Sequence, residues 1–112
     1  MISRRLLAIA AVGSLLTACA NVDVTKTSKG FHEPTDANNI EILKTRPDKN
    51  YEELGTITVT GFSAAESAKM HNAIRAKAAP LGATAVILTD EGLIQKAFGM
   101  DRWATGVAIR YK

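Results

Sequence analysis

The chain has 112 residues, with 14 lysines and arginines against 11 aspartates and glutamates and a net charge of +3. This length allows one small domain with a single core. Because the charges nearly balance and no run of lysines or arginines is present, the electrostatic footprint of a nucleic-acid-binding protein is excluded, and we expect no nucleic-acid partner.

Residues 1–18 have the layout of a secretory signal peptide. A positive start with two arginines precedes an apolar stretch at residues 6–16, and small residues follow it directly before the only cysteine, Cys19. The apolar stretch is too short to span a bilayer. Cleavage before Cys19 would remove the two arginines, so 14 basic residues become 12 against 11 acidic ones and the net charge falls to +1.

The residues Leu16, Thr17, Ala18 and Cys19 resemble the lipobox of bacterial lipoproteins. The resemblance implies cleavage before Cys19 and a covalent lipid on its sulfur, which makes the membrane a partner through the lipid anchor. Two or three acyl chains hold a domain on a membrane, whereas one gives only reversible binding. Ala20 stands where lipoproteins kept in the inner membrane often carry Asp, so the resemblance favours the outer membrane, facing the periplasm. The alternative is an ordinary signal peptide or short anchor with a cysteine nearby by chance.

Cysteine and histidine usage limits the cofactors that the chain can hold. With its only thiol lipidated, the mature domain can form no internal disulfide and has no cysteine for metal or redox chemistry. His32 and His71 have no spacing that would bring both into a zinc site. We therefore expect no metal and no cofactor apart from the covalent lipid on Cys19.

Residues 19–39 are predicted to be the lipidated cysteine followed by a flexible tether. The segment is rich in Thr, Ser, Lys, Asp and Asn and has few large apolar residues. Such a composition is typical of a linker. The folded part is predicted to be a single domain at residues 40–112.

Two strands are predicted in the first half of this domain. Residues 40–43 read Ile-Glu-Ile-Leu and are followed by a turn with a proline. Residues 54–61 alternate, with Ile57 and Val59 on one side and three threonines on the other. This alternation predicts a strand with one buried face.

A helix is predicted at residues 64–79. Ser63 and Glu66 form a capping-box pattern at its start. Ser67, Met70, Ile74 and Ala78 share one face at helical spacing, and Pro80 with Gly82 closes the helix.

Two further strands follow, at residues 83–89 and 103–112. The second alternates, with Trp103, Thr105 and Val107 on one side and smaller residues on the other. The predicted order is β-β-α-β-β. The simplest way to bury these apolar rows is a small, mostly antiparallel sheet with one helix packed on one face, which belongs to the α+β class.

Three runs in the domain carry a family resemblance: residues 47–61, 74–79 and 81–88, the last reading Leu-Gly-Ala-Thr-Ala-Val-Ile-Leu. They resemble the small envelope domains related to YbjQ and to the Rcs stress-sensor lipoprotein RcsF. The resemblance implies the same strand, helix and central-strand order. The sensor-type domains carry paired cysteines and the YbjQ group has been linked to metal binding, but this sequence has neither the cysteines nor a histidine cluster, so no family site is carried over.

The sequence gives no set of residues for catalysis. Residues 61–65, which include Ser63, lack the final glycine of a nucleophile elbow, and Ser63 is already predicted to cap the helix. The adjacent acidic pairs at residues 52–53 and 90–91 diverge on an extended chain. Because no nucleophile, base and orienting group can be named together, we expect no catalytic residue and no enzyme.

One segment, residues 90–102, has more apolar area than a solvent loop needs. The candidate partner patch in it consists of Leu93, Ile94, Phe98 and Met100. At helical spacing, Leu93, Ile94, Ala97 and Phe98 would form a short apolar face. One alternative, preferred because the domain otherwise has little core, is that the segment folds over an end of the sheet. The other is an exposed patch that docks a partner or contacts a membrane.

A second candidate surface is the sheet face opposite the helix. Small residues are predicted there: Thr56, Thr58, Ala104, Gly106 and Ala108. We expect residues 31–39 to lie partly across this face. Such a face can otherwise be solvated or used for docking.

Together these patterns predict a non-enzymatic outer-membrane lipoprotein whose periplasmic domain binds an envelope protein partner in a structural, assembly or stress-signalling role. The lipid would fix the domain to one membrane and raise its effective concentration there. The alternative is a periplasmic small-ligand or peptide-binding module.

Overall fold

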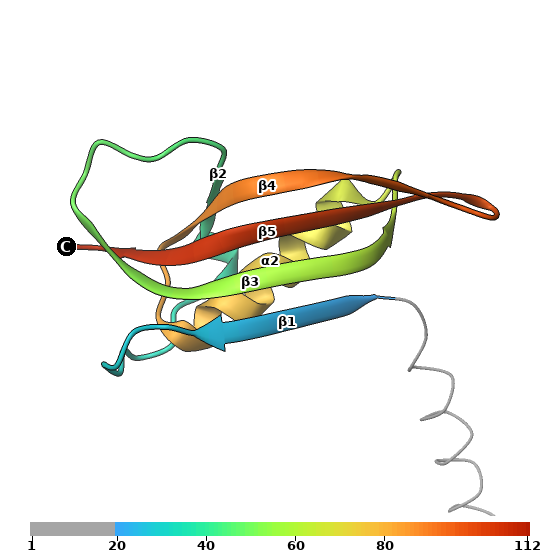
Figure 1. The fold of residues 1–112 in the computed structure, drawn as a ribbon. Helices are drawn as coiled ribbons and strands as arrows, with labels where there is room; N and C mark the ends of the chain where they lie inside the picture. Colours follow the sequence, from blue (N-terminus) through green and yellow to red (C-terminus); the bar gives the residue numbers. More distant parts are fainter. Residues whose placement is uncertain (1–19) are drawn as a thin grey trace, which may run out of the picture.

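Five strands form one mixed sheet that carries a helix on one face (Figure 1). The structure is a computed structural model and describes residues 20–112. In chain order the elements are β1 (Asn21–Lys26), the short 3-10 helix η1 (Ala37–Asn39), β2 (Glu41–Leu43), β3 (Tyr51–Ser63), α2 (Ser67–Ala78), the 3-10 helix η2 (Ala79–Leu81), β4 (Ala85–Lys96) and β5 (Gly99–Tyr111). The predicted α+β class is confirmed.

The sheet order is β1-β3-β5-β4-β2. All neighbouring strands are antiparallel except β2 and β4, which pair in parallel at one edge. The four predicted strands correspond to β2, β3, β4 and β5, and the predicted helix corresponds to α2. The observed order differs from the prediction by one additional strand, β1, at the start.

Strand β1 corrects the prediction of a flexible tether. Residues 21–26 are not a tether but pair along β3, with Asn21 opposite Thr60. Val22 and Val24 occupy alternate positions, and Val22 packs against the core while the other five residues are exposed. An edge strand needs only a few apolar side chains, and polar residues protect its open edge from further pairing. The sheet therefore begins at residue 21 and not at residue 40.

The segment after β1 runs beside the end of α2 rather than across the open sheet face, so the prediction for residues 31–39 is wrong. The backbone N–H of Thr35 donates to the carbonyl of Ala79 at 3.0 Å, and its hydroxyl donates to the carbonyl of Ala83 at 2.6 Å. Helix ends leave carbonyl groups without intrahelical partners. The carbonyl of Ala79, which also accepts from the N–H of Gly82, gains a second donor from Thr35, and this contact holds the segment at the helix end.

Helix α2 begins at Ser67, three residues after the predicted start, because β3 continues to Ser63 and a turn follows. Half of the predicted capping box is present: the N–H of Ser63 donates to Oε1 of Glu66 at 2.9 Å. This hydrogen bond, followed by that of the Lys69 ammonium, lowers the pKa of the Glu66 carboxyl. The pair closes the turn before the helix rather than capping its first turn.

The core lies between α2 and the sheet. Met70, Ile74 and Ala78 are buried on one face of the helix, as predicted. They belong to one buried cluster with residues of three strands, Leu54, Ile57, Val59, Val86, Leu88, Ala104 and Ala108.

The structure corrects the predicted composition of the open sheet face. Ala104 lies opposite Val59 on the buried, helix-facing side, and Ala108 is buried there too. Gly106 faces the same side, where an added Cβ would lie 2.9 Å from Cγ1 of Val86. The alternation along β5 was predicted correctly, but side chains of directly opposed residues share one face, and the assignment of the small residues to the threonine face was wrong.

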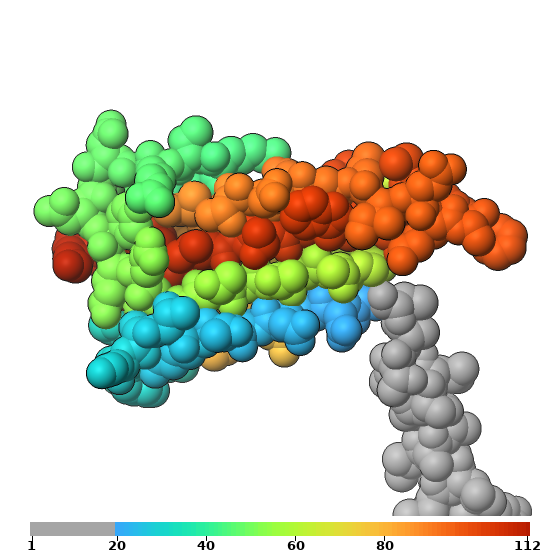
Figure 2. Space-filling model, in the orientation of Figure 1, coloured from blue at the N-terminus to red at the C-terminus, as the bar shows by residue number. Residues whose placement is uncertain are grey.

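The face away from α2 is covered at one end only (Figure 2). Under the β2–β3 loop lies a second cluster made of Ala85, Ile87 and Ile109 with Leu43, Tyr51, Val107 and Tyr111. The Lys49 ammonium lies 4.8 Å from the centre of the Tyr111 ring, and burial, followed by the Glu41 charge, raises the pKa of Tyr111. Near the middle of the sheet this face carries hydroxyl groups, and those of Thr58 and Thr105 lie 3.3 Å apart.

Candidate functional site: the β4–β5 hairpin

Strands β4 and β5 form a hairpin that extends past the rest of the sheet. Their pairing runs to Lys96 opposite Gly99, which leaves Ala97 and Phe98 as the turn. Gly99 has φ 135°, a backbone conformation that other residues rarely adopt. Strand β3 ends at Ser63 opposite Asp101, so the hairpin end has no third strand beside it (Figure 1).

The predicted helical spacing in this segment is wrong, because the residues between 90 and 102 are strand residues on both sides of a two-residue turn. The short apolar run fits both the helical and the strand periodicity, and the pairing between the two halves of the segment favours the hairpin. Each strand supplies hydrogen-bond partners to the other, so the segment needs no helix to satisfy its backbone.

All four residues of the predicted partner patch are exposed. We call them the hairpin patch: Leu93 is 45% exposed, Ile94 46%, Phe98 103% and Met100 42%. The preferred alternative, in which they enlarge the core, is therefore wrong. Past the end of β3, neither the helix nor a further strand covers Phe98 and Met100, while Leu93 and Ile94 lie level with Phe62 and Ser63, the last two residues of β3.

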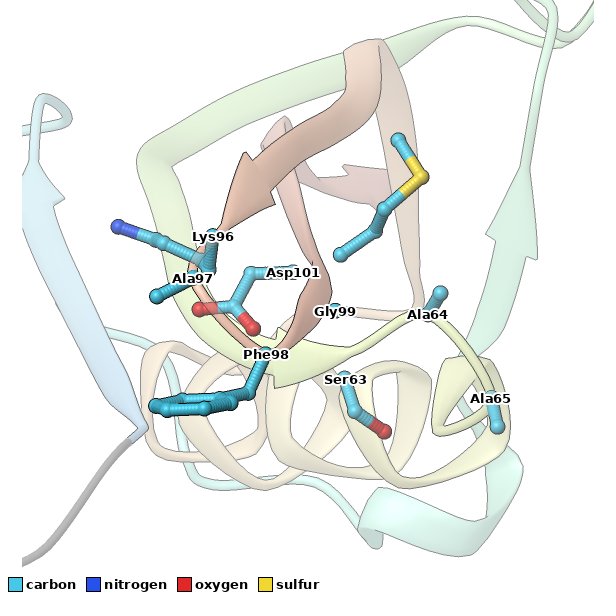
Figure 3. Close-up of a pocket in the computed structure, with 9 residues that line it drawn as sticks. Ser63, Ala64, Ala65, Lys96, Ala97, Phe98, Gly99 and Asp101 are labelled. Carbon is cyan, nitrogen blue, oxygen red and sulfur yellow. The ribbon is translucent and has the colours of Figure 1, made fainter.

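The hairpin patch surrounds the hairpin end instead of lying on one face. Ile94 lies opposite Asp101, whereas Leu93 lies opposite Arg102, which pairs with the core-facing Phe62. Because side chains alternate along a strand, Leu93 projects on the helix side and Ile94 on the other side. Phe98 projects from the turn itself, clear of the neighbouring side chains (Figure 3).

A hollow of about 630 Å³ lies between the hairpin end and the β3–α2 turn, lined by residues 63–65 and 96–101. Two hydrogen bonds fix the turn to the hairpin. The N–H of Ala64 donates to the carbonyl of Met100 at 2.9 Å, and Nε of Arg102 donates to the carbonyl of Ala64 at 2.6 Å. The lining is mostly apolar, so the hollow suits a small apolar group.

The root of the hairpin is stiffened by a contact that our sequence analysis missed. The Trp103 ring lies against Gly92, where an added Cβ would be 2.8 Å from Nε1 of the indole. A glycine inside a strand pattern often marks such a close approach. Gly92, at the start of the exposed stretch, was therefore the sequence signal from which this close contact could have been predicted.

The titratable side chains do not converge on the hairpin patch. His32 donates from Nε2 to Oε2 of Glu52 at 3.0 Å. His71 lies on α2, where burial, followed by the Arg75 charge, lowers its pKa. Among residues 20–112, no group of three His, Cys, Asp or Glu side chains is placed to hold a metal ion. No helix within that range has the length and apolar character needed to cross a membrane.

The lipobox residues Leu16, Thr17, Ala18 and Cys19 lie outside the described residues, so lipidation of Cys19 stays a prediction. What the structure adds is the position of the next segment. Strand β1 begins at Asn21, only two residues after Cys19 in the sequence.

The fold and the hairpin define a small α+β domain with one helix on a five-stranded sheet and an exposed apolar end. One solved structure, the Francisella virulence factor FvfA, is similar, with a TM-score of 0.58 and 13% sequence identity over 80% of this chain and 96% of that one. At this identity the similarity shows the fold alone. No protein-family model matches the chain, and no curated protein matches it. The resemblance to YbjQ and RcsF domains thus stays a prediction.

Proposed function

We propose that this chain is a lipoprotein of the bacterial outer membrane, held through acylated Cys19 and facing the periplasm, whose domain acts by binding another envelope component. The observation that carries the proposal is the hairpin patch, in which four large apolar side chains are exposed at one protruding end. Large apolar patches on soluble domains mark contact surfaces. The lipobox pattern and Ala20 support the membrane assignment.

Binding rather than catalysis is supported by how the polar side chains are used. Ser63, the one serine of the elbow-like motif, donates its backbone N–H to Glu66 at a turn. His32 pairs with Glu52, and His71 lies on the helix. His32 has a carboxylate partner, and neither Ser63 nor His71 is placed in a set of nucleophile, base and orienting group, so we assign none of them a role as nucleophile or base. The role we propose is accordingly structural, in assembly or in stress signalling.

Photocrosslinking in cells tests this proposal. A photoreactive amino acid replaces Phe98 in one variant and Thr58, on the open sheet face, in a second. Phe31 is the matched control because it is also an exposed phenylalanine, 78% exposed, on the loop after β1. We expect specific adducts from position 98, and mass spectrometry then identifies a protein partner or lipid. Equal labelling from positions 98, 58 and 31 would contradict a binding surface.

A second candidate function, a small-ligand or peptide-binding module, is favoured by the hollow of about 630 Å³ beside the hairpin patch. A ligand that binds only the folded state stabilises it by about 2.7 kcal/mol at a hundredfold excess over Kd, and this raises the melting temperature. Thermal shifts across a panel of small apolar compounds and peptides measure this. A reproducible shift that is lost in Ala64→Leu, which fills the hollow, would favour this second function.

A further inference from the structure

We propose that the tip of the β4–β5 hairpin rests in the same bilayer that holds the acylated Cys19. This inference depends on the proposed function, because it takes the lipid anchor as given, and it names the component that the hairpin patch contacts. The tip would give the domain a second attachment to the membrane. With two attachments, the end of the sheet that holds the start of β1 and the hairpin tip faces the bilayer. The sheet then stands upright, and its open face does not lie on the membrane surface.

The direction of β1 carries the first step. Val22 of β1 lies opposite Val59 of β3, which lies opposite Ala104 of β5, so these three residues mark one level across the sheet. From this level, β1 leads back toward Cys19 in the same direction in which β5 leads back toward Phe98. The beginning of β1 and the hairpin tip lie at the same end of the sheet, and the C-terminus lies at the other end (Figure 1).

The lengths of the two segments carry the second step. Phe98 is six residues from Ala104, and at about 3.3 Å per strand residue the tip lies roughly 20 Å beyond that level. Cys19 is three residues from Val22, and even a fully extended chain reaches at most about 11 Å beyond the level. The tip can therefore extend about 10 Å past the anchor, while the headgroup layer on each side of a bilayer is about 5–8 Å thick. A domain standing upright would place its tip at the boundary with the acyl chains.

The side chains of the tip suit that depth. Residues 95–100 lie beyond the reach of Cys19; they include Phe98 and Met100, contain no carboxylate and carry a single charge, on Lys96. Leu93 and Ile94 lie level with Arg102 and Asp101, nearer the domain. A lysine at this position can keep its ammonium among lipid phosphates while its stem stays in the apolar layer. The two strands pair with each other up to Lys96 opposite Gly99, while their outer edges are open, so the backbone suits the headgroup boundary and not the hydrocarbon core.

Spin labelling of the full lipidated protein tests the inference. The acylated Cys19 offers no thiol, so Ala97→Cys introduces a single labelling site beside Phe98, and Asn50→Cys provides a site at the opposite end of the sheet. The labelled proteins are reconstituted in vesicles of phosphatidylethanolamine and phosphatidylglycerol. Collision with oxygen and with a water-soluble nickel complex then gives the depth of each label. We expect the label at position 97 to lie about 5–10 Å below the phosphates and the label at position 50 to report water.

Two matched substitutions show whether the apolar side chain is responsible. In the Ala97→Cys protein, Phe98→Asp is expected to move the label into water, whereas Phe31→Asp, at the other exposed phenylalanine, leaves its depth unchanged. Both side chains are exposed, so both variants are expected to fold, and circular dichroism with thermal unfolding checks this.

The outcomes separate this inference from the proposed function. A label at position 97 that is as accessible to nickel as the one at position 50, in acylated and vesicle-bound protein, overturns the inference and leaves the lipoprotein assignment intact. A discrete protein adduct from position 98 in cells also overturns it, while supporting a binding function. An intact mass without acyl groups on Cys19 overturns both.

Discussion

Gly82 ends the helical segment in a conformation that a side chain would strain. Its φ is 83°, and an added Cβ would lie 2.5 Å from Cβ of His32. We expect Gly82→Ala to lower the free energy of unfolding by at least about 1–2 kcal/mol, the cost of the left-handed conformation, with the contact to His32 adding to it. Urea denaturation measures this. Gly30→Ala is the control, since nothing lies within 4 Å of the added atom. Equal stability of the two variants would contradict this role.

His71 makes stability depend on pH. Because burial and the Arg75 charge lower its pKa, the unfolded chain takes up the proton at a higher pH than the folded one. Stability contributed by the neutral form is therefore complete above the ordinary histidine pKa of about 6.5 and falls as pH decreases toward the lowered pKa. We expect His71→Gln to reduce the pH dependence of the free energy of unfolding, measured by urea denaturation, across this pH range. The lowered pKa of Glu66 acts in a separate, more acidic window. An unchanged slope in His71→Gln would contradict the assignment.

At the scale of elements, the sequence predicts those helices and strands whose apolar spacing fits only one type of secondary structure. The face formed by Met70, Ile74 and Ala78 fits only a helix, and Ile57 with Val59 fits only a half-buried strand. Both predictions are confirmed. The patch residues were also selected correctly from the sequence, because an apolar excess in a connecting segment is visible without knowing its conformation.

The remaining elements depend on partners that lie far away in the sequence. Strand β1 has almost no buried side chain of its own, and its strand conformation depends on hydrogen bonds to β3, whose paired residues lie 29 to 39 positions later. The hairpin at residues 90–102 likewise follows from the pairing of its two halves. Whether the residues at its tip are buried depends on where β3 ends, and the local sequence of the hairpin does not contain that information.

Gly55 tests whether β1 is held as the structure shows. An added Cβ there would lie 2.7 Å from the carbonyl oxygen of Thr25, a backbone atom that can move only if β1 moves. We expect Gly55→Ala to cost about 1–3 kcal/mol and to release residues 21–26 from the sheet. Hydrogen exchange read by mass spectrometry would show lost protection in that peptide. Thr60→Ala, an exposed position on the same strand, is the control. Retained protection in Gly55→Ala would contradict the close packing of β1 on β3.

At the scale of the whole molecule, the same strand sets how far the domain of the proposed lipoprotein would stand from the membrane. A tether at residues 19–39 would let the domain move freely over tens of ångströms. With β1 in the sheet, only Ala20 separates Cys19 from the first strand residue. In the lipoprotein that we propose, the anchor and the hairpin tip would then act on one rigid body, and attachment at one would favour contact at the other.

Inserting slack beside the anchor tests this coupling. Burying the Phe98 side chain contributes about 1.5–3 kcal/mol. This is less than the roughly 4.1 kcal/mol that corresponds to a Kd of 1 mM, so the tip depends on the high effective concentration that a short connection gives. Ten Gly and Ser residues between Ala20 and Asn21 give a coil of about 20 Å. We expect the label at position 97 to become more accessible to water in vesicles.

The same ten residues inserted in the β2–β3 loop, between Asp48 and Lys49, provide the control. That loop lies over the other end of the sheet, and we expect the depth of the label to be unchanged there. An insertion beside Asn21 that also leaves the depth unchanged would mean that the tip enters the bilayer through its own affinity. The short connection from Cys19 to β1 would then have no part in orienting the domain, and the alignment of β1 with the hairpin would be a feature of the sheet alone.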